Sequence, residues 1–187
     1  MEDQATGSLT PLDVAVSRVA GLVETLGIEA NPEPHHNYID LLVPSDRLQE
    51  VALSLRNQLG YGFLSMVTAV DYPDRIQVVY LAFTLEHPHG VFLRTDVPRE
   101  ESAAACPTLT TVWPGAEFQE REVYDMMGVH FLGHPDMTRI LTEDLFPGHP
   151  LRKDFSIEPD YVLMRHLRHG VDGQLAPDDE DSARDRA

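Results

Sequence analysis

Histidines are the first residues of this sequence whose chemistry needs testing, because neutral imidazole is the commonest metal ligand in proteins. There are nine, including His130, His134 and the His-Pro-His run at 87–89. Gly133 and Pro135 interrupt the helix that would bring His130 and His134 onto one face. Because neither a His-Glu-x-x-His pattern nor a cysteine pair adds the remaining ligands, we predict no metal site in this chain.

A group of acids between Glu117 and Asp125 is the second candidate, since paired carboxylates can act as general acid and base. Arg121 lies four residues from both Glu117 and Asp125, a spacing that allows ion pairs within a helix. Such pairs, on a solvent-exposed face that also carries Phe118, explain most of these acids. Glu120 falls at the edge of the apolar face, where an unpaired carboxylate is costly. We therefore predict a structural ion-pair helix of Glu120, Arg121 and Asp125, with Glu120 semi-buried, Arg121 its possible counter-charge, and no catalytic residue.

The sequence lacks the loops that hold nucleotide and flavin phosphates. Neither G-x-G-x-x-G nor G-x-x-x-x-G-K-[ST] occurs, and the nucleophile motif G-x-S-x-G is also absent. Cys106 is the only cysteine, which excludes an intrachain disulfide and a four-thiolate iron–sulfur cluster within the chain. We therefore expect no cofactor in this chain.

The charge balance limits the class of partner. The 187 residues include 31 acids and 14 Lys or Arg, a formal net charge of −17. Nucleic acids and anionic lipids need a basic surface, so we expect neither as a partner. Such an excess of acids more often indicates solubility or a basic partner surface. No apolar run approaches the roughly 20 residues of a membrane helix, and the acidic start differs from a secretion signal. We expect a soluble, cytoplasmic protein that reaches a membrane only through partners.

Helix and strand patterns alternate over the first hundred residues. Thr10, Pro11 and Asp13 mark a helix start, and Gly27 and Gly60 mark helix ends. The expected elements are a helix at 11–27, a strand at 38–43, a helix capped by Ser45 or Asp46 and ending at Gly60, and strands at 63–71, 75–85 and 91–97. Short turns between the last three strands predict antiparallel neighbours. The fold class we predict is α+β, with a mostly antiparallel sheet, helices packed on one face, and an extended docking arm after it.

Composition divides the chain into four parts. We expect residues 1–10 to be a disordered lead, 11–106 the α+β core domain, 107–169 a charged helix with an extended docking segment, and 170–187 an acidic disordered tail. The end of the core domain and the residues just after it, 99–107, are expected to form a loop of small residues.

The docking segment opens with the charged helix, for which Pro114 marks the first turn and Gly128 the end. After Gly128 the chain is extended and interrupted by Gly-His-Pro turns. Such a segment cannot enclose a hydrophobic core of its own, so it must pack against another surface. The run at 151–155 combines an aromatic anchor with charges, as interface hot spots do. We predict that it docks onto a partner through Leu151, Arg152, Lys153, Asp154 and Phe155.

Several runs of the second half resemble the C (30 kDa-type) subunit of respiratory complex I. They are Glu120–Gly128, Phe131, Gly133–Asp136, Arg139–Leu141 and Gly148–Phe155, in that order. Thr138 departs from the family, which usually has a basic or proline residue there, and this puts the contact made at that position in question. The first hundred residues agree with the family only in the order of their elements.

The resemblance implies a non-catalytic, structural role in the hydrophilic arm of proton-translocating NADH:quinone oxidoreductase, on the cytoplasmic side of the cell membrane. It implies the D (49 kDa-type) subunit as the chief neighbour, with FMN and iron–sulfur clusters in partner subunits. Related subunits occur in ferredoxin-dependent and coenzyme F420-dependent enzymes and in membrane-bound hydrogenases, and the sequence does not select among them. Two alternatives from other classes are a free-standing metal-dependent hydrolase and a solitary adaptor domain.

Overall fold

The computed structural model describes residues 10–143 and 146–156, and its first helix, α1 (Pro11–Thr25), begins where the sequence predicts. The Thr10 hydroxyl accepts from the N–H of Asp13, and the Asp13 carboxylate accepts from the N–H of Thr10. This reciprocal pair is a capping box, which satisfies two of the free N–H groups at a helix start. Gly27, with a φ of 65°, follows the helix end as predicted.

The second helix, α2 (Leu48–Leu59), follows a short 3-10 turn, η1 (Ser45–Arg47). Gly60 ends α2 with a φ of 75°, as predicted. The expected side-chain cap by Ser45 or Asp46 is wrong, because Pro44 occupies the cap position of η1 and places both residues inside the turn.

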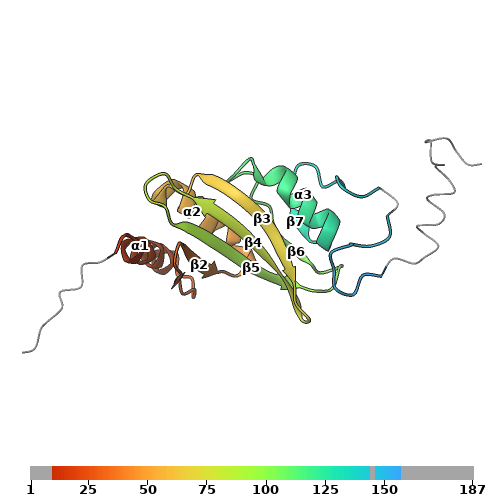
Figure 1. The fold of residues 1–187 in the computed structure, drawn as a ribbon, viewed down its shortest axis with the longest axis horizontal. Coiled ribbons are helices and arrows are strands. Elements are labelled where there is room, and N and C mark those ends of the chain that lie inside the picture. The colour runs from red at the N-terminus through yellow and green to blue at the C-terminus, as the bar shows by residue number, and fades with distance from the viewer. Residues whose placement is uncertain (1–9, 144–145, 157–187) are drawn as a thin grey trace, which may run out of the picture. The chain divides into compact units, whose positions relative to one another are not determined.

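Five strands form the main sheet, in the order β1-β2-β5-β4-β3 (Figure 1). They are β1 (Glu33–Pro34), β2 (Tyr38–Leu42), β3 (Phe63–Asp71), β4 (Arg75–Phe83) and β5 (Gly90–Pro98). β4 pairs antiparallel with both β3 and β5, as the short turns predict. β2 pairs parallel with β5, with Ile39 opposite Val91, and this pairing was not predicted. It requires a long crossover, which α2, β3 and β4 supply.

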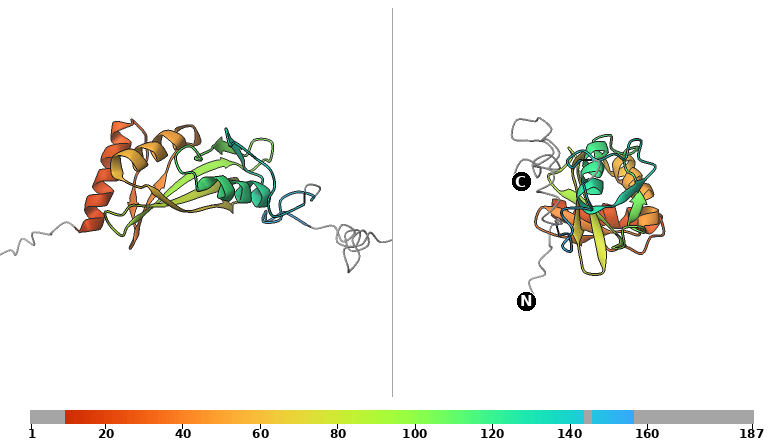
Figure 2. Two further views of the ribbon diagram at one scale, coloured as in Figure 1. Left: turned by 90° about the horizontal axis from the view of Figure 1, so that it is seen from above. Right: turned by 90° about the vertical axis from the view of Figure 1, so that its right-hand side faces the viewer.

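The charged helix predicted from the sequence is α3 (Ala116–Met127), and it ends at Gly128, whose φ is 75°. Pro114 lies in the turn before α3 and not in its first turn. α3 runs beside the edge strand β3, where Gln119 Oε1 accepts a hydrogen bond from the Val67 N–H at 2.7 Å. This contact covers part of an edge that could otherwise pair with another chain. In the views of Figures 1 and 2, α1 and α2 lie toward one end of the sheet and α3 toward the other.

One face of the main sheet is buried and the other is partly open. On β2, Ile39 and Leu41 are 0% exposed, whereas Leu42 is 48% exposed. Strand pairing places Tyr80 and Leu93 on the same buried face as Leu41. That face packs against apolar residues of α1, α2 and α3 in a single hydrophobic core. The predicted α+β fold, mostly antiparallel with helices on one face, is therefore confirmed.

A second, two-stranded sheet joins β6 (Ala105–Pro107) to β7 (His130–Leu132) in parallel. The loop expected at 99–107 is thus wrong over its last three residues. Such short strands exist because they pair with a distant partner, which local composition does not record. The pairing ties α3 and the chain that follows it back to the main body.

The structure separates into two compact units, one that extends through Arg152 and one that begins at Lys153. β6 lies across the predicted boundary at residue 106, and the division of the chain into four parts stays a prediction. Nearly all of the predicted lead, the last part of the predicted docking segment from 157 on, and the acidic tail lie outside the described residues.

Candidate docking site

Glu120 is completely buried on the inner side of α3, at 0% exposure. Its carboxylate accepts hydrogen bonds from the Tyr80 hydroxyl at 3.0 Å, the Thr108 hydroxyl at 2.5 Å and the Leu109 N–H at 2.8 Å. Burial raises the pKa of this carboxyl above its ordinary value, although the three hydrogen bonds act in the opposite direction. The prediction that Arg121 is its counter-charge is wrong, because neutral donors reach Glu120 from within the core.

Arg121 instead reaches the segment after β7. Its guanidinium donates to the Thr138 carbonyl at 3.1 Å and hydroxyl at 2.5 Å, and it pairs with Asp136 at 3.4 Å. Within the described residues it forms no ion pair with Glu117 or Asp125, so those two predicted pairs are wrong. An exposed helical pair contributes only about 0.5 kcal/mol, whereas Thr138 offers two acceptors to the planar guanidinium. Thr138, where the sequence departs from the family pattern, is the residue that holds Arg121.

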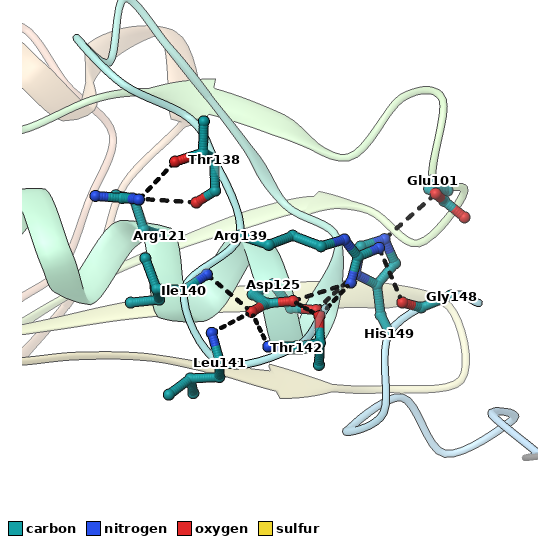
Figure 3. Close-up of polar contacts among 10 residues, drawn as sticks. All are labelled: Glu101, Arg121, Asp125, Thr138, Arg139, Ile140, Leu141, Thr142, Gly148 and His149. Atoms are coloured by element: carbon teal, nitrogen blue, oxygen red, sulfur yellow. Dashed lines mark hydrogen bonds and ion pairs between the residues drawn. The ribbon is translucent and has the colours of Figure 1, made fainter. Parts of the chain in front are cut away.

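Asp125 is enclosed by a loop that wraps the outer side of α3 (Figure 3). The N–H groups of Ile140, Leu141 and Thr142 donate to its Oδ2 at 3.1, 2.7 and 2.9 Å. The Arg139 guanidinium and the Thr142 hydroxyl donate to its Oδ1 at 2.9 and 2.5 Å. Successive backbone N–H groups that converge on one oxygen form an anion-binding nest.

We call residues 138–142 the Asp125 loop. Under it the Asp125 side chain is 0% exposed. Burial alone would raise the pKa of Asp125, but the hydrogen bonds from Thr142 and the other loop residues together lower it to about 2. The predicted solvent-facing position of Asp125 is therefore wrong. Its side chain does point away from the core, but a distant segment covers it, whereas Phe118 on the same predicted face is 63% exposed.

The chain after the Asp125 loop caps the end of α3. An α-helix leaves its last four carbonyls without partners inside the helix. The carbonyls of residues 125–127 accept, in order, from His149 Nδ1 at 2.9 Å, the Leu151 N–H at 3.0 Å and Arg152 Nε at 2.8 Å. Because a carbonyl only accepts, Nδ1 of His149 carries the hydrogen. The extended segment thus replaces the next turn of the helix.

His149 packs directly against the glycine that ends α3. A Cβ built on Gly128 would lie 2.6 Å from the imidazole Cδ2, and the φ of 75° already favours glycine. The His149 ring is buried, and its Nε2 lies 3.3 Å from the Glu101 carboxylate (Figure 3). Arg139 donates to the Gly148 carbonyl at 3.1 Å and so links the Asp125 loop to this cap.

Of the five predicted docking residues, Arg152 is engaged within its own chain. Its guanidinium donates to two backbone carbonyls, at 2.8 and 3.0 Å, and the residue is half-buried. Leu151 is 59% exposed. Lys153 and Asp154 are exposed, and Phe155 is half-buried. The docking role of these five residues stays a prediction, but Arg152 already has a structural task.

Sequence reasoning missed a second set of exposed apolar side chains in the same part of the chain. Leu132 and Leu141 are 61% and 62% exposed, and Ile140 is 37% exposed. It also missed Arg139 and His149 as partners of α3. The runs that contain Ile140, Leu141, Arg139 and His149 stand out in the sequence only through their resemblance to a family, since each contacts residues at least ten positions away.

His130 and His134, the pair that suggested a metal site, have other contacts in the structure. Within residues 10–143 and 146–156, no group of three or more His, Cys, Asp or Glu side chains is arranged to hold a metal ion. The His134 ring hydrogen-bonds the Glu117 carbonyl at 3.0 Å, and the His130 ring packs edge-on against Tyr124. In the part of the chain that the structure describes, no helix combines the length and apolar character needed to cross a membrane.

Comparison of the sequence with known proteins identifies a family and several relatives. Residues 41–161 match the family described as the respiratory-chain NADH dehydrogenase 30 kDa subunit. The NADH-quinone oxidoreductase C subunit of Moorella thermoacetica is 45% identical over 64% of this chain and 81% of its own length. The C subunit of Novosphingobium aromaticivorans is 40% identical over 78% of this chain, which spans only 47% of that relative.

Two solved structures have a similar fold. A chain of the membrane-bound sulfane sulfur reductase, an archaeal respiratory membrane complex, matches with a TM-score of 0.69 and 27% identity, over 82% of this chain and 91% of that one. A trypsin-resistant fragment of Nqo5 matches with a TM-score of 0.53 and 30% identity, over 64% of this chain and 97% of the fragment. By its sequence, this chain belongs to the family of the 30 kDa subunit of respiratory-chain NADH dehydrogenases.

Proposed function

We propose that this chain is a non-catalytic structural and assembly subunit in the hydrophilic arm of a proton-translocating NADH:quinone oxidoreductase. In that enzyme electrons pass from NADH to quinone, and their passage is coupled to proton pumping. The chain contributes surface and stiffness, while FMN and the iron–sulfur clusters belong to partner subunits. A long electron-transfer assembly needs fixed distances between its centres, and a rigid side domain helps to keep them.

The main support for the proposal is the burial and hydrogen bonding of two acidic side chains on α3. A catalytic acid or base must reach a substrate. Glu120 and Asp125 are instead both 0% exposed, and each accepts several hydrogen bonds from its own chain. Side chains so enclosed favour rigidity over turnover. The family to which the chain belongs supplies the setting in which such rigidity is useful.

We further propose that the chain docks chiefly onto a D (49 kDa-type) subunit, on the cytoplasmic side of the cell membrane, and that it reaches the membrane only through partners. The run at 151–155 supports this, since Leu151 is 59% exposed and Lys153 and Asp154 are also exposed. Leu151 and Phe155 would be the apolar anchors of this contact, and Lys153 would set its register. Arg152 would fix the start of the run to the body.

Capture of the tagged full chain from native membranes tests the proposal. We expect a flavin- and NADH-binding subunit and a D-type subunit to co-purify with it. Lys153→Glu combined with Phe155→Ala should abolish both assembly and NADH:quinone activity, while circular dichroism shows that the isolated variant is still folded. Intact assembly with normal turnover would refute the docking role of this run. Elution of the wild-type chain alone would favour a solitary adaptor, and stoichiometric bound zinc or manganese would favour a hydrolase.

A second candidate keeps the fold and changes the complex. The likeness to a chain of an archaeal respiratory membrane complex, at a TM-score of 0.69, favours an equivalent subunit in a related enzyme with another electron donor. Ferredoxin-dependent and coenzyme F420-dependent enzymes and membrane-bound hydrogenases are of this kind. The identity of the co-purifying input subunit decides between the candidates. A nickel–iron subunit in place of a flavin- and NADH-binding one would indicate a hydrogenase.

A further inference from the structure

The Asp125 loop exposes the apolar side chains of Ile140 and Leu141, while its backbone N–H groups are bound to the buried Asp125 carboxylate. The N–H groups of Ile140 and Leu141 both donate to the buried Asp125 carboxylate, at 3.1 and 2.7 Å. Their side chains are nevertheless 37% and 62% exposed. Figure 3 shows the Leu141 side chain directed away from the carboxylate that binds its own N–H. The loop therefore presents this pair on a rigid base.

The fixed backbone distinguishes this pair from the exposed leucine at position 85. Leu85 is 103% exposed, but it lies in the turn between β4 and β5, outside the strands that the turn connects. A single exposed leucine of that kind is common on protein surfaces and needs no partner. A side chain on a pre-ordered backbone loses less conformational freedom on binding, so it makes a more effective anchor.

The charges beside the loop indicate the kind of partner that fits it. Glu122 lies on α3, one turn before Asp125, and it is exposed without an ion pair among the described residues. Asp136 pairs with Arg121 at 3.4 Å, and its side chain is still 53% exposed. A partner surface with Lys or Arg around an apolar pocket would complement these acids. A second copy of the chain would not, because each copy carries a formal net charge of −17.

We propose that Ile140 and Leu141 form an apolar anchor that inserts into a pocket, bordered by Lys or Arg, on a neighbouring subunit of the complex. Asp125 is the positioning residue of this anchor, because its carboxylate fixes the backbone from which both side chains project. The inference rests on the proposed function, since it takes the neighbour to be another subunit of the respiratory complex. It adds a contact separate from the run at 151–155.

The test uses the tagged full chain captured from native membranes. Leu141→Asp should lower the yield of the co-purifying subunits at least ten-fold and leave the melting temperature of the isolated chain unchanged. Leu85→Asp is the matched control, with the same substitution at an exposed leucine without a fixed base, and it should capture the complex normally. If wild type and Leu141→Asp capture the complex equally well, the inference is overturned.

Failure of the proposed function looks different, because then the wild-type chain itself captures no respiratory subunit. The oligomeric state of the free chain gives a further outcome. A wild-type dimer in solution that Leu141→Asp converts to a monomer would identify a second copy as the occupant and overturn the assignment to a different, basic partner. A wild-type monomer that captures the complex only with Leu141 present supports it.

The positioning role of Asp125 has its own readout. In Asp125→Asn, we expect faster hydrogen exchange at the amides of residues 140–142, with exchange in the main sheet unchanged, and at least a five-fold lower capture. Adding Leu141→Asp to Asp125→Asn should cause little further loss of capture, since both changes disable one anchor. Additive losses would mean that Asp125 acts only through general stability, and would refute its positioning role.

Discussion

Glu120 and Asp125 lie five residues apart on α3, and both carboxylates are 0% exposed, yet different parts of the chain enclose them. Glu120 faces the core and accepts from two hydroxyls and one N–H. Asp125 faces outward and accepts from a guanidinium, a hydroxyl and three N–H groups of one loop. Their pKa values move apart, raised for Glu120 and lowered to about 2 for Asp125.

This contrast shows how one helix joins two regions with different chemistry. The inner carboxylate is held by groups of the sheet and of the chain after β6, so its loss affects the main core. The outer carboxylate is held by residues 139–142, so its loss affects mainly the segment that wraps α3. Substitution of Glu120 should therefore lower the stability of the whole domain, whereas substitution of Asp125 should mainly disorder the outer segment.

Glu120→Ala should have the largest effect on the free energy of unfolding. It leaves the Tyr80 hydroxyl, the Thr108 hydroxyl and the Leu109 N–H without their acceptor in the core. A loss of about 3 kcal/mol is expected, since a single unsatisfied buried group costs roughly 1–3 kcal/mol. Urea unfolding of the isolated chain measures it.

Glu122→Ala is the matched control for that substitution, because Glu122 lies on the same helix and is exposed. Its effect should stay within about 0.5 kcal/mol, as for most surface changes. Equal midpoints for wild type and Glu120→Ala would mean that the inner carboxylate contributes nothing to the core.

Asp125→Asn should come second, with a local effect. The amide has one acceptor oxygen, which cannot serve both the three N–H groups and the Arg139 guanidinium, and the ion pair to Arg139 is lost. We expect the free energy of local opening of the segment after β7 to be roughly 2–3 kcal/mol lower than in wild type. Loss of a hydrogen bond to a charged group has an effect of this order. Limited proteolysis should then cut residues 138–152 much sooner, while the main sheet melts near its original temperature. A cut pattern identical to wild type would contradict the contrast between the two acids.

The sequence contained enough information for the main body and too little for the outer segment. The capping box at Thr10, the terminal glycines and the hairpins among β3, β4 and β5 are local signals, and the structure confirms them. Helical periodicity placed Glu120 at the edge of the apolar face and semi-buried, whereas the structure buries it completely. The same periodicity failed for Asp125, because a helical wheel describes only one helix, and the cover comes from residues 14–17 positions later.

Acid should remove the contribution of Asp125 and leave that of Glu120 in place. The pKa of Asp125 falls from 3.8 to about 2 on folding, so the folded state binds this proton less readily than the unfolded chain does. The resulting stability, about 2 kcal/mol at neutral pH, is complete above pH about 5 and about half lost by pH 3. The difference between wild type and Asp125→Asn in the free energy of local opening, measured by hydrogen exchange at residues 140–142, should shrink accordingly. A difference that stays constant down to pH 3 would rule out the lowered pKa.

The raised pKa of Glu120 has the opposite sign. Its folded state binds a proton more readily than the unfolded chain, so acidification does not remove its contribution. The stability difference between wild type and Glu120→Gln should therefore hold or grow as the pH falls. This opposite trend is the control for general acid effects on the chain.

Gly128→Ala isolates the contact between α3 and His149, and its effect beyond backbone strain should be smaller than the effects above. Gly27 and Gly128 both have positive φ, 65° and 75°, but a Cβ at Gly27 meets nothing within 4 Å, whereas one at Gly128 meets the His149 ring at 2.6 Å. Gly27→Ala should thus cost only the backbone strain, about 1 kcal/mol. Gly128→Ala should cost about 1 kcal/mol more, because the ring must leave the Asp125 carbonyl and expose a free carbonyl at the helix end. Urea unfolding of both variants gives the difference directly, and equal losses would mean that His149 moves aside without cost and does not hold the outer segment to the helix.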